Sequence, residues 1–198
     1  MAEKKLTITQ GDITLLPLEE GAIINPSNTG MILNRGVGSA IARRAGPFIQ
    51  QTLHMRRSML NKNRLEPGHA VETEAGQLPV KMLIHVAILG AKNVNERLIS
   101  DCILNAYDLA EELELRSVAF PPLGVESAGF PLEKFLELFW RITNEELPRS
   151  EHILNVLLCC DDEARFDETQ NFLEENLDAL DDRIEIAVEP GGIVPGML

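Results

Sequence analysis

The chain has 198 residues, of which 44% are hydrophobic, and it carries a formal net charge of -13 at pH 7. A chain of this size and composition can bury one sizeable core, which argues against a second large domain. No stretch approaches the ~20 apolar residues that a membrane-spanning helix needs, and the N-terminus lacks a signal-peptide pattern, so we expect a soluble, cytoplasmic protein with no membrane partner.

The N-terminal part of the chain alternates predicted strands and helices. Residues 5–13 alternate apolar and polar side chains as a half-buried strand does, and residues 21–25 form a short apolar run that also predicts a strand. Residues 36–57 have helical spacing with a break at Gly46 and Pro47, which predicts two successive helices.

A polar run, Asn25, Pro26, Ser27 and Asn28, follows the second predicted strand. Residues of these types most often form only a turn. The functional alternative is a polar loop at the end of a buried strand, where open α/β sheets place their ligand sites. The two readings can be separated only by what the rest of the chain contains.

The same alternation continues to the C-terminus. Residues 65–79 have a turn–strand–turn pattern, and residues 80–89 form the nearly continuous apolar run of a central strand covered on both faces. The remaining predicted elements are a helix at 99–113, a strand with a Pro/Gly loop at 116–124, a helix at 131–147, a buried strand at 152–160 and a helix at 166–180. Alternating elements with buried strands predict a three-layer α/β/α domain with a largely parallel or mixed sheet.

The acidic residues are concentrated near the C-terminus. Residues 1–100 carry twelve Lys or Arg against eight Asp or Glu, whereas residues 161–182 carry ten acidic residues and one Arg. We interpret this acidic segment as the solvated face of the last helix. No basic patch interleaved with aromatic residues is present, which argues against a nucleic-acid partner, although the N-terminal half can accept a small anionic ligand. We divide the chain into a domain at 1–182 and, at 183–198, an edge strand with a Pro/Gly-rich tail.

The cysteines and histidines do not form a recognisable catalytic or metal-binding pattern. Cys102, Cys159 and Cys160 match neither a disulfide framework nor a zinc spacing, so we expect buried thiols in a reducing compartment. A catalytic cysteine is the alternative, but no motif points a base at any of them. His85 lies within a predicted buried strand and is interpreted as a core histidine. We expect neither a metal nor a cofactor.

Four segments resemble, in their order and spacing, the macro domain, a family that binds ADP-ribose and related nucleotides. They are "GDIT" at 11–14, "NPSNTGMILNRGVGSAI" at 25–41, "LPVKMLIHVAILG" at 78–90 and "FPPLGVESAGFPLE" at 120–133. The resemblance covers roughly residues 5–180 and implies a three-layer α/β/α fold with a mixed central sheet. It also implies that the ligand or partner is ADP-ribose or an ADP-ribosylated species.

The resemblance assigns the ends of the ligand to particular residues. Asp12, next to the Ile13 backbone, corresponds to the aspartate that accepts a hydrogen bond from the adenine amino group; without the resemblance, Asp12 only caps a turn. Asn28 corresponds to the asparagine that faces the distal ribose, and Asn25 is expected to hold the loop by hydrogen bonds. A nucleotide diphosphate needs these acceptors together with close backbone N–H groups for its phosphates.

The first expected phosphate loop departs from the family pattern. The family has a run of glycines before Val and the next helix, whereas this chain retains only Gly36 before Val37. Arg35 stands where the backbone is usually bare, so it either reaches a phosphate or crowds it.

The second expected phosphate loop comprises Gly124, Val125, Glu126, Ser127, Ala128, Gly129 and Phe130. Glu126 occupies a position where the family has Gly, and a carboxylate beside a diphosphate is repulsive unless it is paired or points away. We hypothesise that Arg35 and Glu126 pair across the mouth of the cleft and narrow it.

Two further departures concern the adenine and catalysis. The family commonly covers the adenine with an aromatic residue after the strand at 152–160, where this chain offers Cys160; Phe130 is a second candidate, with a core anchor as its alternative role. The hydrolase branch with a Val-Asp-Gly signature uses its Asp as a general base, and this chain has Gly38 at that position. Asn28, with a water positioned by the substrate phosphate, is the remaining candidate for slow hydrolysis.

Three functions therefore remain open. The ordered loops favour a binding module for ADP-ribose-type ligands, with weak hydrolysis of ADP-ribosyl or O-acetyl-ADP-ribose substrates as an added activity. Glu126, the filled glycine loop and the acidic C-terminal helix favour instead a macro-like scaffold that acts through protein contacts. A full hydrolase requires Asn28 to suffice without an aspartate at position 38.

Overall fold

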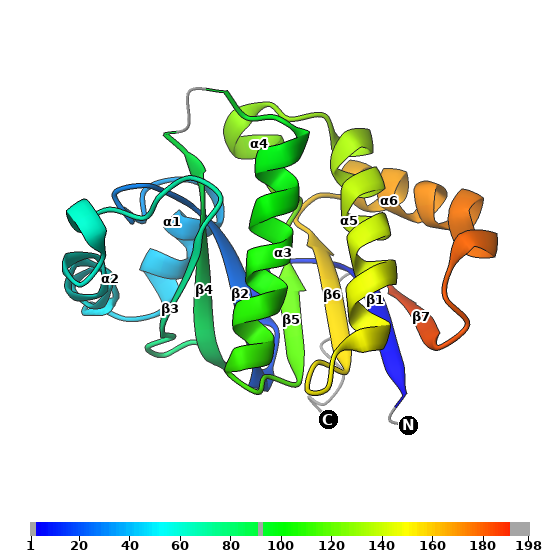
Figure 1. The fold of residues 1–198 in the computed structure, drawn as a ribbon, viewed down its shortest axis with the longest axis horizontal. Coiled ribbons are helices and arrows are strands. Elements are labelled where there is room, and N and C mark those ends of the chain that lie inside the picture. Colours follow the sequence, from blue (N-terminus) through cyan, green and yellow to red (C-terminus); the bar gives the residue numbers. More distant parts are fainter. Residues whose placement is uncertain (1–2, 91–92, 191–198) are drawn as a thin grey trace.

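The computed structural model describes residues 3–90 and 93–190. Within these ranges seven strands form one sheet: β1 (Lys4–Gln10), β2 (Leu18–Asn28), β3 (Ala70–Glu74), β4 (Val80–Leu89), β5 (Ser117–Phe120), β6 (Asn155–Cys160) and β7 (Ile184–Glu189). Their order across the sheet is β3-β4-β2-β5-β6-β1-β7 (Figure 1). The β3–β4 pair is antiparallel and the other pairs are parallel, so the sheet is mixed.

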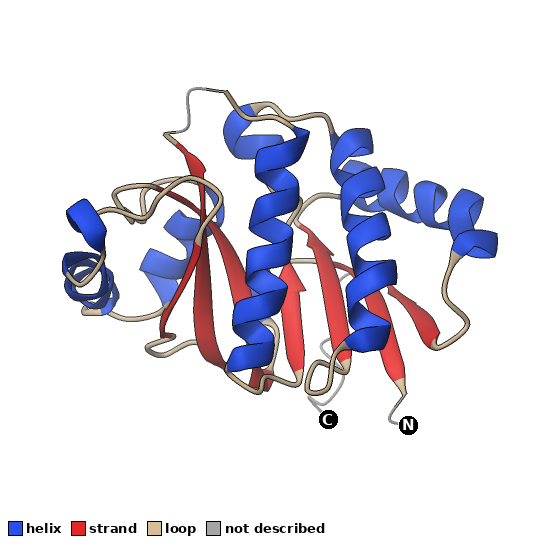
Figure 2. Ribbon diagram, viewed as in Figure 1, coloured by secondary structure: helices blue, strands red, loops and turns tan. Residues whose placement is uncertain are grey.

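Helices cover both faces of this sheet (Figure 2). They are α1 (Gly36–Arg44), α2 (Ile49–Ser58), α3 (Glu96–Glu112), α4 (Val125–Ala128), α5 (Leu132–Glu146) and α6 (Glu163–Asn176). One buried cluster joins α3, α5 and α6 to the sheet, and a second joins α1 and α2 to its other face. The predicted three-layer α/β/α arrangement is therefore confirmed, and the break near Gly46 and Pro47 separates α1 from α2.

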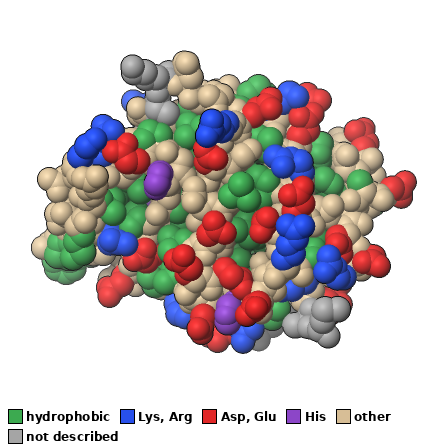
Figure 3. Space-filling model, in the orientation of Figure 1, with side chains coloured by type: hydrophobic (Ala, Val, Ile, Leu, Met, Phe, Trp, Pro, Cys, Tyr) green, Lys and Arg blue, Asp and Glu red, His purple; other side chains and the backbone are tan. Residues whose placement is uncertain are grey.

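Residues 83–88 of the apolar run are buried because both faces of β4 are covered there. Leu83 packs into the cluster with α1 and α2, whereas Ile84 and Val86 pack into the cluster with α3 and α5. Side chains alternate between the faces of a strand, so a strand covered on both sides has no solvent-facing position to fill with polar residues. Figure 3 shows where the charges lie instead, scattered over the outer surface of α3 and α5.

The expectation of a loop at residues 25–28 is wrong, because β2 continues through Asn28. Asn25 and Pro26 pair with His85 and Val86 of β4. On its other side β2 pairs with β5 only over residues 21–23. At Pro26 the strand has a single neighbour, which is the edge-like position where a strand tolerates a residue without a backbone N–H.

The predicted edge strand at the C-terminus is β7, which pairs in parallel with β1. The Pro/Gly-rich tail at 191–198 lies outside the described residues, and the division of the chain at residue 182 stays a prediction. No helix in residues 3–90 and 93–190 is long and apolar enough to cross a membrane.

The turn into β6 is held by a carboxylate at the end of α3. Glu111 accepts hydrogen bonds from the backbone N–H groups of Glu151, His152 at 2.8 Å and Ile153 at 3.3 Å. Burial by itself would raise the pKa of Glu111, but the three N–H donors outweigh it and the pKa lies below its ordinary value. The ionised form of Glu111 therefore stabilises the folded state.

We expect Glu111→Gln to lower the free energy of unfolding at pH 7 by about 1–2 kcal/mol, because an amide replaces one charged acceptor with a donor that faces backbone N–H groups. A depressed folded-state pKa contributes stability above the unfolded value and loses it as the pH falls through the folded value. The difference from wild type should thus be constant above about pH 4.5, the ordinary glutamate pKa, and shrink below it. Urea unfolding of both proteins across this pH range measures the difference in the free energy of unfolding.

The matched control is Glu112→Gln, which changes the exposed neighbouring carboxylate. Equal effects of the two substitutions, or a Glu111→Gln deficit that persists below the folded-state pKa, would contradict the role given to Glu111.

Candidate functional site

A cleft of about 370 Å³ opens at the carboxyl ends of β1, β2, β5 and β6. Open α/β sheets bind their ligands at such a position, because the loops that follow several strands meet there. Its described lining residues come from five segments: Gly11, Asp12 and Ile13; Pro26; Arg35, Gly36, Val37, Ala40 and Arg43; Pro121, Pro122, Glu126 and Ser127; and Cys159, Asp161 and Arg165.

Asp12 lines the cleft, and its carboxylate already accepts hydrogen bonds within the chain. Its Oδ1 accepts hydrogen bonds from the hydroxyl of Thr14 and from the Thr14 backbone N–H at 2.9 Å. Its Oδ2 accepts from Arg44 Nε at 3.2 Å. Burial would raise the pKa of Asp12, but the Thr14 donors and the Arg44 guanidinium together hold it below its ordinary value. Asp12 is therefore ionised at neutral pH and can accept a further hydrogen bond.

The start of α1 also lines the cleft. Arg35 is the N-cap and offers no side-chain capping hydrogen bond, and the helix ladder begins with Ser39 N donating to Arg35 O at 3.1 Å. The N–H groups of the first helical turn therefore lack intrahelical partners, and with the helix dipole they favour an anion. Gly36 has φ +46°, a conformation that suits glycine.

The predicted ion pair between Arg35 and Glu126 is wrong. Among the described residues, Arg35 takes part in no ion pair. Glu126 lies instead against Gly36, where a Cβ would come within 3.7 Å of Glu126 Oε2. The positive φ of Gly36 turns the α1 start toward this carboxylate, so the anionic group in the cleft faces the helix N-terminus rather than a guanidinium.

The loop after β5 is shaped by two glycines and a short helix. Gly124 has φ +79°, and a Cβ there would lie 3.0 Å from Ile99 Cδ1, so this position requires glycine. Gly129, with φ +69°, ends α4. Within α4, the Ser127 Oγ is buried and has no hydrogen-bond partner among the described residues.

Asn25 is engaged beneath the cleft rather than in a loop. Its Nδ2 contacts His85 Nδ1 at 3.0 Å, and His85 Nε2 contacts Thr73 Oγ1 at 2.8 Å. Burial lowers the pKa of His85 to about 3, so the ring is neutral, and the predicted role as a core histidine fits these contacts. The Asn25 Oδ1 is buried without a partner among the described residues and would lie 3.6 Å from a Cβ on Gly38.

Asn28 is used by its own turn. Its Oδ1 accepts from Gly30 N at 3.0 Å and from Ile32 N at 3.2 Å, while its Nδ2 donates to Ile32 O at 2.8 Å. These contacts match the turn that the residue types at 25–28 favour. A side chain with both amide atoms so engaged must break contacts to reach a ribose, which weighs against Asn28 as a catalytic residue.

The two candidates for covering an adenine lie in the core. Phe130 is 8% exposed and packs in the cluster with α3 and α5, as its alternative role predicted. Cys160 belongs to the same cluster and its Sγ contacts Thr169 Oγ1 at 3.5 Å. Because alternate residues of β6 face opposite sides of the sheet, Cys159 rather than Cys160 reaches the cleft.

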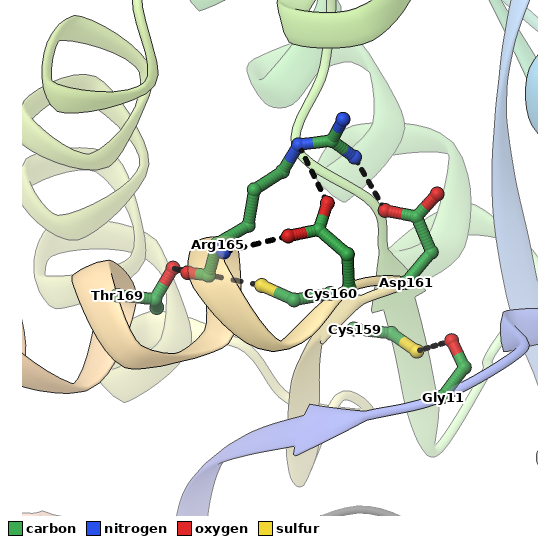
Figure 4. A network of polar contacts seen from close by, with 7 residues as sticks. Gly11, Cys159, Cys160, Asp161, Arg165 and Thr169 are labelled. Carbon is green, nitrogen blue, oxygen red and sulfur yellow. Dashed lines mark hydrogen bonds and ion pairs between the residues drawn. The ribbon is translucent and has the colours of Figure 1, made fainter.

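A network at the end of β6 lies beside Cys159 (Figure 4). Cys159 Sγ donates to Gly11 O at 3.3 Å, which joins this strand end to the turn that carries Asp12. Arg165 donates a hydrogen bond to Asp161 through Nη1, and its Nε forms an ion pair with Asp162 at 3.1 Å. Sequence reasoning missed Arg165, although the only arginine in the acidic segment at 161–182 was a usable signal.

The cysteines are poorly suited to nucleophilic catalysis. Burial raises the pKa of Cys159 to about 12, that of Cys102 to about 12 and that of Cys160 to about 11. Thiols with such values are protonated at neutral pH and react slowly. In the described part of the chain, no group of three or more His, Cys, Asp or Glu side chains could hold a metal ion.

The cleft brings together about half of the predicted site residues. Those at the cleft are Asp12, Ile13, Arg35, Gly36, Val37, Glu126 and Ser127, and those that do not line it are Asn25, Asn28, Gly124, Val125, Ala128, Gly129, Phe130 and Cys160. Several of the second group support the first, as Gly124 and Gly129 do by bounding α4. The role of each residue in binding stays a prediction.

Comparisons with known proteins agree with this geometry. The family model described as "Macro domain" matches residues 24–139. An O-acetyl-ADP-ribose deacetylase from Cronobacter sakazakii is 30% identical over 165 residues, covering 82% of this chain and 89% of that protein. A Klebsiella pneumoniae protein of the same name is 32% identical over 156 residues, covering 77% and 87%.

A solved structure of similar fold contains a bound ligand. A variant of the Oceanobacillus iheyensis macrodomain with ADPR has a TM-score of 0.78 and 26% identity, covering 86% of this chain and 92% of that one. With the family model and the curated relatives in agreement, this chain belongs to the macro domain family.

Proposed function

We propose that the protein binds ADP-ribose or a related ADP-ribosyl nucleotide in the cleft at the strand ends. The observation that carries this proposal is one cleft lined both by an ionised, hydrogen-bonding carboxylate, Asp12, and by the uncapped start of α1. The names of the curated relatives and the ligand of the Oceanobacillus iheyensis structure support it.

The ends of the cleft differ in chemistry, as the ends of the ligand do. The carboxylate of Asp12 suits the amino group of a base, and the adjacent Ile13 offers an apolar surface. The N–H groups at the start of α1, together with Arg35 and Arg43, suit phosphates. Glu126 is the exception, because it places a negative charge at the phosphate end.

Hydrolysis of O-acetyl-ADP-ribose is included in the proposal as a weak activity. The relatives named as deacetylases support an ester hydrolysis. Gly38 provides no carboxylate to act as general base, the thiols are protonated, and Asn28 is held in its turn. Without a base, we expect water to be positioned only by the substrate phosphate, and the rate to be low.

Isothermal titration of ADP-ribose tests the binding. We expect the wild-type protein to bind and Asp12→Asn to weaken binding about tenfold or more, because one carboxylate oxygen becomes a donor. Asn at position 12 keeps an oxygen for Thr14, so the turn should survive. Asp108→Asn, which changes an exposed carboxylate on α3, is the matched control. The absence of binding heat at millimolar ADP-ribose would contradict the proposal. It would favour the alternative, a macro-like scaffold that acts through protein contacts.

Removal of the negative charge at the phosphate end should tighten binding. We expect Glu126→Gln to bind ADP-ribose about two- to fivefold more tightly at low salt, because the carboxylate no longer competes with the phosphates for the start of α1. The gain should shrink at high salt and be absent for adenosine, which carries no charge there. Glu133→Gln, an exposed change on α5, is the control. Weaker binding by Glu126→Gln would show that Glu126 contacts the ligand favourably.

Restoring a carboxylate to α1 tests the account of weak hydrolysis. A Cβ on Gly38 would meet Leu33 at 3.5 Å and Asn25 Oδ1 at 3.6 Å, which are ordinary contacts. We expect Gly38→Asp to release acetate from O-acetyl-ADP-ribose about a hundredfold faster than wild type, by adding a general base. Gly38→Ala, which fills the same space without a base, should not. Acetate release followed by NMR gives the rates, and equal rates for the two variants would refute the account.

A further inference from the structure

Arg165 lines the cleft, and two carboxylates contact its guanidinium (Figure 4). Nη1 donates a hydrogen bond to Asp161 Oδ1, and Nε forms an ion pair with Asp162 Oδ2 at 3.1 Å. Asp162 is itself fixed as the N-cap of α6, since its Oδ1 accepts from Arg165 N at 2.9 Å. The Arg165 side chain is only 27% exposed, so it has little freedom to turn away.

This arrangement makes Arg165 a poor site for an anion. Two carboxylates flank one guanidinium, so the group as a whole is negative and would repel a phosphate. Nη1 and Nε each already face a carboxylate, which leaves fewer N–H groups for a bidentate contact with a phosphate. A flat, neutral ring can lie on the guanidinium without meeting this repulsion.

Arg165 follows the end of β6, beside the turn that carries Asp12. Parallel pairing sets Gln10, the last residue of β1, beside Cys160, the last residue of β6. The Cys159 contact with Gly11 O then holds the two strand ends together at 3.3 Å. The N–H groups suited to phosphates are at the start of α1. Arg165 and Asp12 both line the cleft, so we expect Arg165 to lie near a base that is bound at Asp12.

We propose that the guanidinium of Arg165 stacks on the adenine of the bound nucleotide and thereby selects for a planar base. A guanidinium stacks well on aromatic rings because it is flat, delocalised and weakly hydrated, whereas a lysine ammonium offers only a point charge. Asp161 and Asp162 act as positioning residues that hold the plane. This inference rests on the proposed function and names how the same site recognises its ligand.

The experiment separates planarity from charge. The variants are Arg165→Lys, which keeps the charge, Arg165→Tyr, which keeps a flat face, and Arg165→Ala; Arg141→Ala, an exposed change on α5, is the control. The ligands are ADP-ribose, AMP and ribose 5-phosphate, of which the last is AMP without its base. Affinities come from calorimetry, and the ultraviolet difference spectrum of adenine reports stacking directly.

We expect Arg165→Lys and Arg165→Ala to bind ADP-ribose and AMP about tenfold more weakly and to lose the adenine difference spectrum. Arg165→Tyr should stay within about threefold of wild type, and ribose 5-phosphate should bind all variants alike. If Arg165→Lys binds ADP-ribose and AMP as tightly as wild type, the proposal is wrong, and the charge of Arg165 rather than its flat shape supports binding. The proposal is also wrong if the variants lose affinity equally for all three ligands while their thermal unfolding is unchanged. The substitutions would then act by changing the shape of the cleft.

Failure of this inference is distinct from failure of the proposed function. If wild type and Arg165→Ala bind ADP-ribose equally, stacking is refuted and the function stands. If wild type binds neither ADP-ribose nor AMP at millimolar concentration, the proposed function is refuted, and the stacking role is refuted with it.

Discussion

The parallel pairing of β1 with β6 decides where the groups of the cleft lie. Because the two strands run in the same direction, the turn that carries Asp12 and the turn that carries Arg165 leave the sheet at the same edge. The Cys159 contact with Gly11 O ties these turns together. β2 and β5 deliver the other walls to that edge, so segments more than a hundred residues apart in sequence meet around one cleft.

Two charged residues line the cleft at positions where glycine is expected. Arg35 and Glu126 stand at positions where the family resemblance leads one to expect glycine, and neither is neutralised by the other. Gly36 remains, and its positive φ presents the start of α1 to Glu126. A site that keeps the helix dipole yet adds both a cation and an anion beside it should depend strongly on ionic strength, more than a site lined by backbone N–H groups alone.

The polar residues of β2 serve the fold first. Asn25 is committed to His85, and through it to Thr73, while Asn28 closes the turn that leads toward α1. Burying such groups is costly unless they are hydrogen-bonded, so a chain of partners beneath the cleft is the expected solution. The one unpaired acceptor among them in the described residues, Asn25 Oδ1, lies close to Gly38.

The sequence by itself determined the fold class, the order of the elements and the general place of the site. Hydrophobic periodicity is a local property, so it can be read from a run such as residues 80–89, and the turn residues mark where each run ends. The resemblance to the macro domain, rather than periodicity, singled out Asp12, Gly36 and Glu126. Neither could show that residues 25–28 stay in the sheet, because that depends on β4 pairing alongside them.

Only the tertiary structure decided which side chains share the cleft. The choice of Cys159 over Cys160 depends on which face of β6 is covered, and the placing of Glu126 against Gly36 rather than Arg35 depends on backbone angles at two distant loops. Arg165 was hidden because its role comes from two neighbouring carboxylates and from a strand pairing 150 residues away in sequence. Contacts between distant segments are set by packing and register, which no local pattern contains.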